Sequence, residues 1–250
     1  MIFEVFGFSF DSSGLILFAL VGVLVGMAKT GVQGVGMMAV PILAIIFGGK
    51  ESSGIMLPIL ILADMFGVTY YHRHADFSHL VKLLRPTIIG VLLGTYVGSS
   101  IDDEQFRLIM GITILGSLIL MMWKQSAEGI VTSHWSFAWA VGLAAGFTTM
   151  VGNLAGTVMA LYLLSMRMPK NQFIGTAAWF FLCINLFKVP FHIWAWQSIS
   201  VSSFLLDLCL LPAIALGAFL GIRIIKRLPE MAFRYFIIIM TLVAAIFMIV

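Results

Sequence analysis

The sequence has few charged side chains, and this shortage excludes most classes of soluble protein. Only 10% of its 250 residues are Asp, Glu, Lys or Arg, against about a quarter in an ordinary soluble domain. Hydrophobic residues make up 61%, in stretches near the length of a bilayer crossing, about 17–25 residues. So little polar surface could not cover such an apolar core in water. We therefore expect an all-α polytopic membrane protein.

Cysteine is equally scarce, and the motifs of membrane-embedded enzymes are missing. Cys183 and Cys209 lie in apolar runs without a CxxC or Cys/His spacing, so neither a disulfide nor a metal site is predicted. The chain has no HExxH and no GxSxG, and His192 near one expected membrane edge has no intramembrane Ser or Asp beside it. Three histidines gather near Asp76 in the loop at 72–79, but their spacing matches no zinc arrangement. The sequence predicts no catalytic residue, no metal and no cofactor.

Ten apolar segments follow one another along the chain. The first two segments of each half are short and joined with almost no loop, which indicates either two thin crossings or a broken, re-entrant hairpin. The segments cover about residues 14–29, 33–47, 53–71, 86–100 and 105–123 in the first half, and 135–150, 153–166, 172–194, 201–222 and 231–250 in the second.

The two halves resemble each other in sequence. "VGVLVGMAKTGVQGVG" (Val21–Gly36) aligns without a gap with "VGLAAGFTTMVGNLAG" (Val141–Gly156), at a shift of 120 residues. Further on, "LGTYVG" (Leu93–Gly98) aligns with "LGAFLG" (Leu216–Gly221). The order and spacing of these matches predict an internal repeat.

Basic residues concentrate in one set of loops. Ten of the 14 Lys and Arg side chains fall in 73–85, at Lys124, in 167–170 and in 223–234. The positive-inside rule places these loops in the cytoplasm and both termini outside. Each half then has five segments, and the halves begin on opposite sides of the membrane, an arrangement typical of secondary transporters. The expected divisions are an extracytoplasmic segment at 1–13, a first repeat at 14–123, a cytoplasmic linker at 124–134 and a second repeat at 135–250.

A lysine and four glycines interrupt the apolar stretch "GMAKTGVQGVGMMAVP" (Gly26–Pro41). A charge such as that of Lys29 is costly within a bilayer, so such residues usually face a cavity. The alternative is that its long side chain extends to the membrane interface. Thr30, Gln33, Gly34 and the other glycines suit an unwound helix break whose backbone N–H groups can face a ligand. Together they predict a site for an anion.

The matching break in the second half, "FTTMVGNLAG", supplies hydrogen-bond donors without a charge. Its polar residues are Thr148, Thr149 and Asn153. Two breaks related by an inverted repeat would meet near the midplane and enclose one substrate. Lys188, the other intramembrane lysine, either belongs to this site or marks the membrane edge beside Pro190. One or two lysines favour a small oxyanion over a sugar or a cation.

Two acidic residues also lie in apolar segments. Asp64 stands in "LILADMFG" and Asp207 in "FLLDLCLLP". Intramembrane carboxyl groups can carry protons, so both are candidates for proton coupling. The alternatives are a helix-end position or a salt bridge, for which Asp64 could pair with a buried lysine. Asn185 corresponds to Asp64 at a shift of 121 residues and is expected in the same cavity.

Three stretches of the sequence resemble those of a known protein family. "GMAKTGVQGVGMMAVPIL", its echo "GFTTMVGNLAGTVMALYLL" and "LGAFLGIRIIKRLPEMAFRYF" resemble the sulfite exporter TauE/SafE family over nearly the whole chain. The resemblance implies a bacterial inner-membrane transporter of sulfite, sulfonates or other small sulfur-containing or organic anions. Pro41 follows the first glycine motif, but Leu161 takes its place in the second half. The motifs therefore identify the family and not the substrate.

These observations lead to one expected function and its alternatives. We expect a secondary transporter that exports sulfite or an organosulfonate by proton-coupled alternating access. The alternatives are a passive anion channel with the same site, or an uptake carrier for another such anion. The expected partners are a small anion, a proton and the lipid bilayer, with no nucleic acid, and a homodimer remains open.

Overall fold

The computed structural model of the chain describes residues 2–32, 34–106, 108–109, 112–113, 116, 135–229, 231–233, 235 and 239. The expected linker at 124–134, most of the segments at 105–123 and 231–250, and Gln33 lie outside these residues. The N-terminal residues form a hairpin of two antiparallel strands, β1 (Ile2–Val5) and β2 (Phe8–Asp11). Most of the rest of the described chain is helical.

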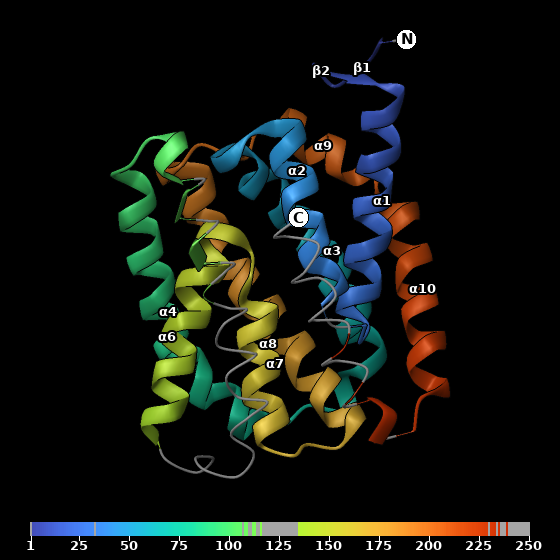
Figure 1. Cartoon of the computed structure of the whole chain (residues 1–250), viewed down its shortest axis with the longest axis vertical. Coiled ribbons are helices and arrows are strands. Elements are labelled where there is room, and N and C mark those ends of the chain that lie inside the picture. Colours follow the sequence, from blue (N-terminus) through green and yellow to red (C-terminus); the bar gives the residue numbers. More distant parts are fainter. Residues whose placement is uncertain are drawn as a thin grey trace.

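The described helices follow the expected segments closely. The first half contains α1 (Ser12–Lys29), the 3-10 turn η1 (Val35–Met38), α2 (Ala39–Phe47), α3 (Gly49–Tyr71), the 3-10 turn η2 (His72–His74) and α4 (Phe77–Ser99). The second half contains α6 (Trp135–Gly152), α7 (Ala155–Ser165), α8 (Lys170–Pro190), the π-helical turn η3 (Phe191–Ala195), α9 (Val201–Cys209) and α10 (Leu211–Arg227). Figure 1 shows their arrangement.

Four of the described helical stretches are long and apolar enough to cross a membrane. They are Ser12–Lys29, Gly49–His74, Phe77–Ser99 and Lys170–Ala195. Helices α9 and α10, bent by 48° at a short break, make a fifth if they are taken as one span. Helices α2 and α7 have only 9 and 11 residues, too few for a crossing that needs about 20. The prediction of an all-α polytopic membrane protein is confirmed.

Helix α4 begins nine residues before the apolar segment expected at Pro86. Asp76 starts it, because its side chain accepts hydrogen bonds from the backbone N–H groups of Ser78 and His79, at 3.0 and 3.2 Å. Pro86 lies inside the helix, and a methyl group added at Gly142 of α6 would come within 2.4 Å of its ring. The proline is thus a packing residue and not a helix boundary.

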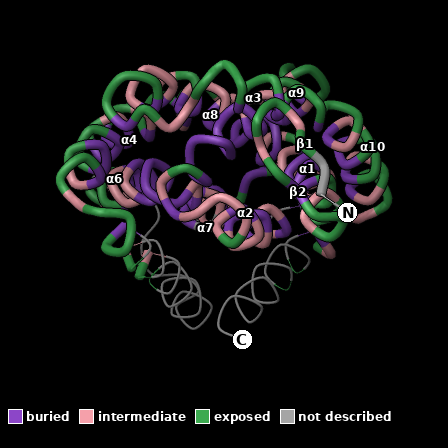
Figure 2. The backbone as a smooth tube through the Cα atoms, turned by 90° about the horizontal axis from the view of Figure 1, so that it is seen from above, coloured by how far each residue is buried: buried purple, intermediate pink, exposed green. Residues whose placement is uncertain are grey.

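Two pairs of helices pack at glycines, one pair on each side of the molecule. A β-carbon at Gly26 of α1 would lie 2.2 Å from the carbonyl oxygen of Ile214 on α10, and one at Gly146 of α6 would lie 2.1 Å from that of Thr87 on α4. Small residues let membrane helices approach backbone to backbone in this way. Seen from above, the buried parts of α3 and α8 lie between the α4/α6 pair and the α1/α10 pair (Figure 2).

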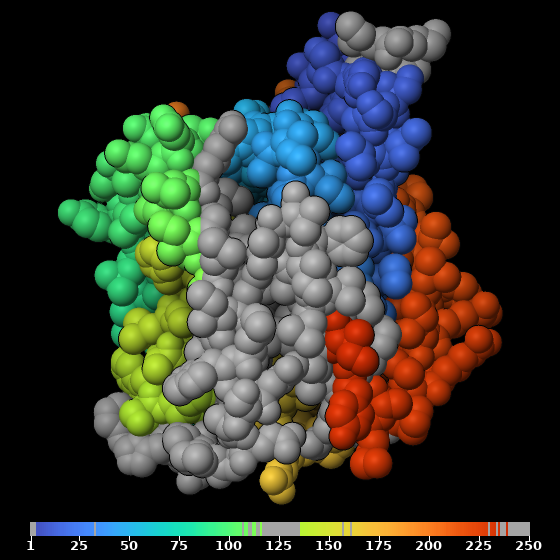
Figure 3. Space-filling view, viewed as in Figure 1, coloured from blue at the N-terminus to red at the C-terminus, as the bar shows by residue number. Residues whose placement is uncertain are grey.

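The loops gather at two opposite ends of the helices. At one end Lys170 Nζ donates to the carbonyls of Ile225 and Leu228, at 3.2 and 2.6 Å, and links the start of α8 to the end of α10. At the other end the backbone N–H of Lys50 donates to Asp103 at 2.8 Å. The start of α1 and strand β2 project from this second end (Figure 3). The basic loops at 73–85, 167–170 and 223–227 therefore share one end, away from the N-terminal hairpin.

Candidate functional site

The expected helix break follows α1 directly. Helix α1 ends at Lys29, and Gly31 and Gly34 then adopt φ angles of 120° and 91°, a region that residues with a β-carbon rarely enter. The hydroxyl of Thr30 donates to the carbonyls of Gly26 and of Ala218 on α10, at 2.9 and 3.2 Å. Thr30 thus closes the helix end and fixes it against α10, while Lys29 is left at the edge of the break.

A second break separates α6 from α7. Asn153 turns the chain there with a φ of 56°, a left-handed conformation for which asparagine is better suited than most residues. Its backbone N–H donates to the carbonyl of Thr149 at 3.1 Å. The hydroxyl of Thr148 donates to Ala144 of its own helix at 2.8 Å. The two breaks therefore stand at matching places of the two halves, as the sequence predicts.

A buried ion pair lies beside the first break. Lys29 Nζ is 2.9 Å from Asp64 Oδ1 on α3, and it lies 3.9 Å from the ring centroid of Phe181 on α8. The side chain of Asp64 is fully buried, and that of Lys29 keeps 10% of its surface exposed. The amide of Asn185 donates to the second oxygen, Asp64 Oδ2, at 2.7 Å. Lys29 thus turns inward to a carboxylate and does not extend to the membrane interface.

Lys188 is also buried inside the molecule, with no exposed surface. Its ammonium donates to the carbonyl oxygen of Thr149 at 2.8 Å and to Asn153 Oδ1 at 2.6 Å, with longer contacts of 3.3 Å to Thr149 Oγ1 and Asn185 Oδ1. These partners are neutral oxygens. Among the described residues no carboxylate forms a salt bridge with Lys188. Its burial among these oxygens places it inside the molecule and not at a membrane edge.

A cavity of about 60 Å³ opens beside these groups, enough for several waters or one small oxyanion. Its polar lining comes from Lys29, Thr149, Asn153 and Asn185. The glycines at 34, 36 and 156 bring both breaks against it, and the rest of the wall is apolar, with Met37, Met56, Leu60 and Phe181 among its side chains. We call this space the central cavity. Thr30 and Thr148 are close in sequence but do not line it.

Two residues beside this site, Ser53 and Phe181, were not predicted from the sequence. Asn153 Nδ2 donates to the carbonyl and hydroxyl oxygens of Ser53, at 3.3 and 3.4 Å, which connects the second break to the start of α3. The polar cluster "GKESSG" around Ser53 was the available signal. Phe181, whose ring faces Lys29, stands in the uniform aromatic run "WFFL" and offers no such signal.

The remaining titratable candidates lie elsewhere. Asp207 on α9 is fully buried, does not line the central cavity, and neither of its oxygens has a hydrogen-bond partner among the described residues. His79 Nδ1 lies 3.0 Å from the hydroxyl of Tyr162. No group of three metal-ligating side chains occurs in the described part of the chain. Cys183 and Cys209 are free thiols, and Cys209 is exposed rather than in the core.

Comparison with known proteins gives one match. The family described as "Sulfite exporter TauE/SafE" matches residues 17–248, nearly the whole chain. No curated protein and no solved structure matches it. Members of this family are membrane transporters and not enzymes, in agreement with the apolar helices that could span a bilayer. The chain belongs to the sulfite exporter TauE/SafE family.

Proposed function

We propose that this protein is a secondary transporter that exports a small anion, sulfite or an organosulfonate, across the bacterial inner membrane with proton coupling. The observation that carries the proposal is the central cavity, which Lys29 lines, together with Lys188 and Asp64, which are buried beside it and do not line it. Among these described groups two lysines stand beside a single carboxylate. With all three ionised, the described groups carry one net positive charge. Such a charge in a low-dielectric interior favours an anionic ligand strongly.

The ion pair suggests how a proton would be coupled to the anion. Lys29 is the cation that lines the central cavity, and Asp64 already holds it at 2.9 Å. An entering anion competes with Asp64 for this ammonium. Protonation of Asp64 removes the competing charge, so proton and anion would bind together. The proton then travels with the anion, and the outward anion gradient or the membrane potential must drive export.

The same coupling of proton and anion would also allow uptake, which is the alternative direction of transport. When an inward proton gradient outweighs the anion gradient, a carrier that binds proton and anion together runs inward. The direction in the cell therefore depends on the gradients as well as on the protein, and export is proposed from the family to which the chain belongs.

The packing of the helices supports alternating access between two inverted repeats. Each pair of packed helices takes one helix from each half of the sequence. The pair α1/α10 on one side of the molecule corresponds to the pair α6/α4 on the other, because α1 aligns with α6 and α10 aligns with α4. Helices α3 and α8 contact each other between these pairs. Rocking of one repeat against the other around a central site is the usual movement of such transporters. We further propose that the end with the basic loops faces the cytoplasm and that both termini lie outside.

A binding panel on the purified protein tests this function. Sulfite, sulfate, thiosulfate, taurine and sulfoacetate are each added to wild type, Lys29→Gln and the control Lys50→Gln at the far end of the molecule. A ligand at about 100 times its Kd stabilises the folded state by about 2.7 kcal/mol, so a rise in the melting temperature is expected in wild type and Lys50→Gln and not in Lys29→Gln. The absence of any shift would reject an anion site.

Flux measurements then separate a carrier from a passive channel. Wild-type protein is reconstituted in vesicles with radioactive sulfite, and a pH gradient is imposed. Accumulation against the sulfite gradient, lost when an uncoupler is added, is expected of the carrier. Equilibration without accumulation would favour the channel.

A further inference from the structure

A second cavity lies at the end of the molecule where the basic loops gather. It has a volume of about 320 Å³ and opens among three elements: the end of α3 with η2, the start of α8 and the end of α10. Its lining residues are Tyr70, Tyr71, His74, Lys170, Asn171, Ile225 and Lys226. These described residues include two lysines and a histidine and no carboxylate. The described lining therefore supplies positive charge and hydrogen-bond donors.

The two lysines of this cavity differ in their contacts and in their exposure. Lys170 is fixed in its wall by the carbonyls of Ile225 and Leu228. Lys226 is exposed, and its ammonium stands 5.1 Å from the ring centroid of Tyr70. Asn171 follows Lys170 in the first turn of α8, where the helix dipole adds partial positive charge. A small anion in this cavity would thus meet an exposed ammonium, a buttressed ammonium and the start of a helix.

An apolar layer at Gly31 lies where the wall of this cavity meets the wall of the central cavity. Ile174 lines the central cavity and Ile225 lines the second one. Both isoleucines pack on the backbone of Gly31, because a β-carbon there would lie 2.8 Å from Ile174 Cδ1 and 2.9 Å from Ile225 Cγ1. Gly31 is part of the helix break that follows Lys29. A displacement of this break would therefore move the layer that separates the two cavities.

We propose that the second cavity is an anion-binding vestibule, in which the transported anion is held before it passes the Gly31–Ile174–Ile225 layer to reach Lys29. This inference rests on the proposed anion transport and adds a second binding subsite with its own residues. The ligand is the same small oxyanion as in the central cavity. Lys226 attracts it electrostatically, and because this side chain is exposed, its effect is on capture rather than on the strength of final binding.

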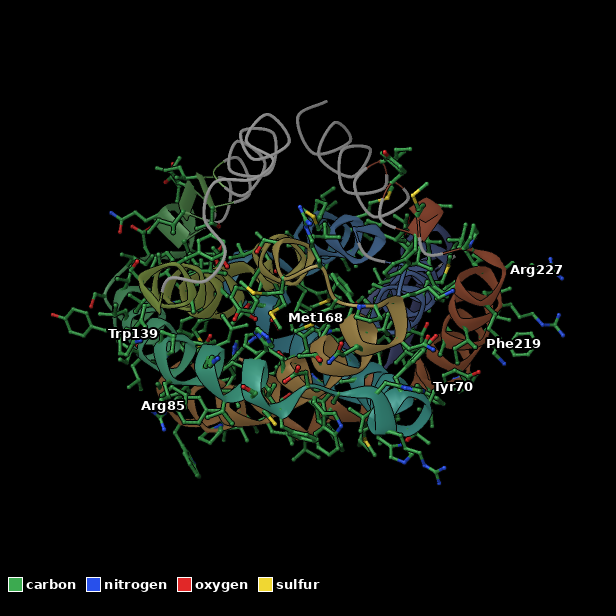
Figure 4. The ribbon with its side chains drawn as sticks, turned by 90° about the horizontal axis from the view of Figure 1, so that it is seen from below. Tyr70, Arg85, Trp139, Met168, Phe219 and Arg227 are labelled. Carbon is green, nitrogen blue, oxygen red and sulfur yellow. The ribbon has the colours of Figure 1, made fainter. Side chains whose placement is uncertain are left out.

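The proposal has to be distinguished from the ordinary role of such residues. Lysine and tyrosine are common at membrane interfaces, where lysine meets the phosphate of lipid headgroups. Both ligands would present an oxyanion to Lys226, so the lipid composition of the test vesicles must separate them. Arg227 provides a matched control, since it is the next basic residue of α10, does not line the cavity and lies at the rim of the molecule (Figure 4).

The experiment measures initial rates of sulfite uptake in vesicles whose protein orientation has been determined. Wild type, Lys226→Gln, Lys226→Arg and Arg227→Gln are compared at low ionic strength, in phosphatidylcholine alone and with added phosphatidylglycerol. With sulfite supplied at the vestibule end, Lys226→Gln should raise the half-saturating concentration roughly threefold to tenfold and leave the maximal rate unchanged. Lys226→Arg and Arg227→Gln should behave as wild type, and high salt should remove the difference.

The other possible results distinguish a failure of the vestibule proposal from a failure of the proposed sulfite transport. Equal half-saturation in Lys226→Gln and Arg227→Gln would reject the vestibule while sulfite transport itself stands. An effect of Lys226→Gln confined to vesicles with phosphatidylglycerol would assign the cavity to lipid headgroups and reject it as an anion subsite. A wild type without sulfite flux would overturn the transport of sulfite and the vestibule together.

Discussion

The side-chain amide of Asn185 donates a hydrogen bond of 2.7 Å to the carboxylate of Asp64. These are the residues that the alignment of the two halves matches at a shift of 121. Contacts between matching residues are expected near the axis that relates two repeats, and this contact agrees with the internal repeat that the sequence predicts. It also joins the two lysines, because Asp64 holds Lys29 and the carbonyl of Asn185 accepts from Lys188.

Replacement of Asp64 by Asn should abolish the pH dependence of anion binding. In wild type the anion competes with the Asp64 carboxylate for Lys29, so affinity should rise as the pH falls and Asp64 takes up a proton. One coupled proton limits this rise to about tenfold per pH unit. In Asp64→Asn, Lys29 has no competing carboxylate, and sulfite affinity should be as high at neutral pH as in the acid limit of wild type.

Thermal-shift titrations with sulfite across the neutral pH range measure this difference. Glu51→Gln, at the exposed start of α3, is the control and should retain the wild-type profile. An unchanged profile in Asp64→Asn would move the coupling carboxylate elsewhere, with the buried Asp207 as the next residue to change.

The helix breaks and the residues around them could be predicted because their causes are local. Glycine and asparagine adopt positive φ angles more readily than other residues, and such a residue ends a helix. "KTGVQG" and "VGNLAG" therefore predict helix breaks, which the structure has at Gly31 and Asn153. The matched spacing of Asp64 and Asn185 predicts one cavity for both; their side chains do meet at 2.7 Å, but of the two only Asn185 lines the central cavity. These predictions needed only the sequence and the repeat.

The partners of Lys188 and the position of Pro86 inside α4 could not be predicted, because they depend on contacts between distant segments. A lysine near a proline looks the same in sequence whether it meets water or an interior oxygen, and only the fold brings Asn153 and Thr149 to Lys188. Likewise Pro86 suggests a helix end until Gly142 of another helix is found against it. Tertiary packing decided both cases.

Replacement of Lys188 by Met should lower both stability and anion affinity. The variant removes the donor to the side-chain oxygen of Asn153 and one of the two donors to the carbonyl of Thr149, which keeps the backbone N–H of Asn153. Leaving a buried acceptor unpaired costs about 1–3 kcal/mol. It also removes the excess positive charge beside the central cavity. Leu186→Met, at an exposed position of the same helix, is the control. A melting temperature and sulfite shift equal to those of Leu186→Met would show that Lys188 serves neither purpose.

Alanine at the glycines of the two helix pairs should destabilise the protein on both sides of the molecule. The added carbon would lie 2.2 Å from the carbonyl of Ile214 in Gly26→Ala and 2.1 Å from that of Thr87 in Gly146→Ala. A backbone atom cannot swing aside as a side chain does, so each pair of helices must separate, at a cost of about 1–3 kcal/mol. Gly156→Ala is the control, because no atom lies within 4 Å of its β-carbon. Equal losses of melting temperature in all three variants would contradict close packing as the cause.

Alanine at Gly31 should impair the protein for two separable reasons. The φ of 120° is unfavourable for any residue with a β-carbon, at a cost of about 1–3 kcal/mol, and the new methyl group would also collide with Ile174 Cδ1 at 2.8 Å. Ile174→Val removes that terminal carbon and leaves the backbone as it is. The double variant should therefore recover the part of the loss that comes from Ile174, and neither the contact with Ile225 Cγ1 at 2.9 Å nor the backbone part. A cycle of melting temperatures over wild type, both single variants and the double variant measures this coupling. Additive effects of the two changes would mean that Ile174 does not press on Gly31, and the apolar layer between the two cavities would then need another explanation.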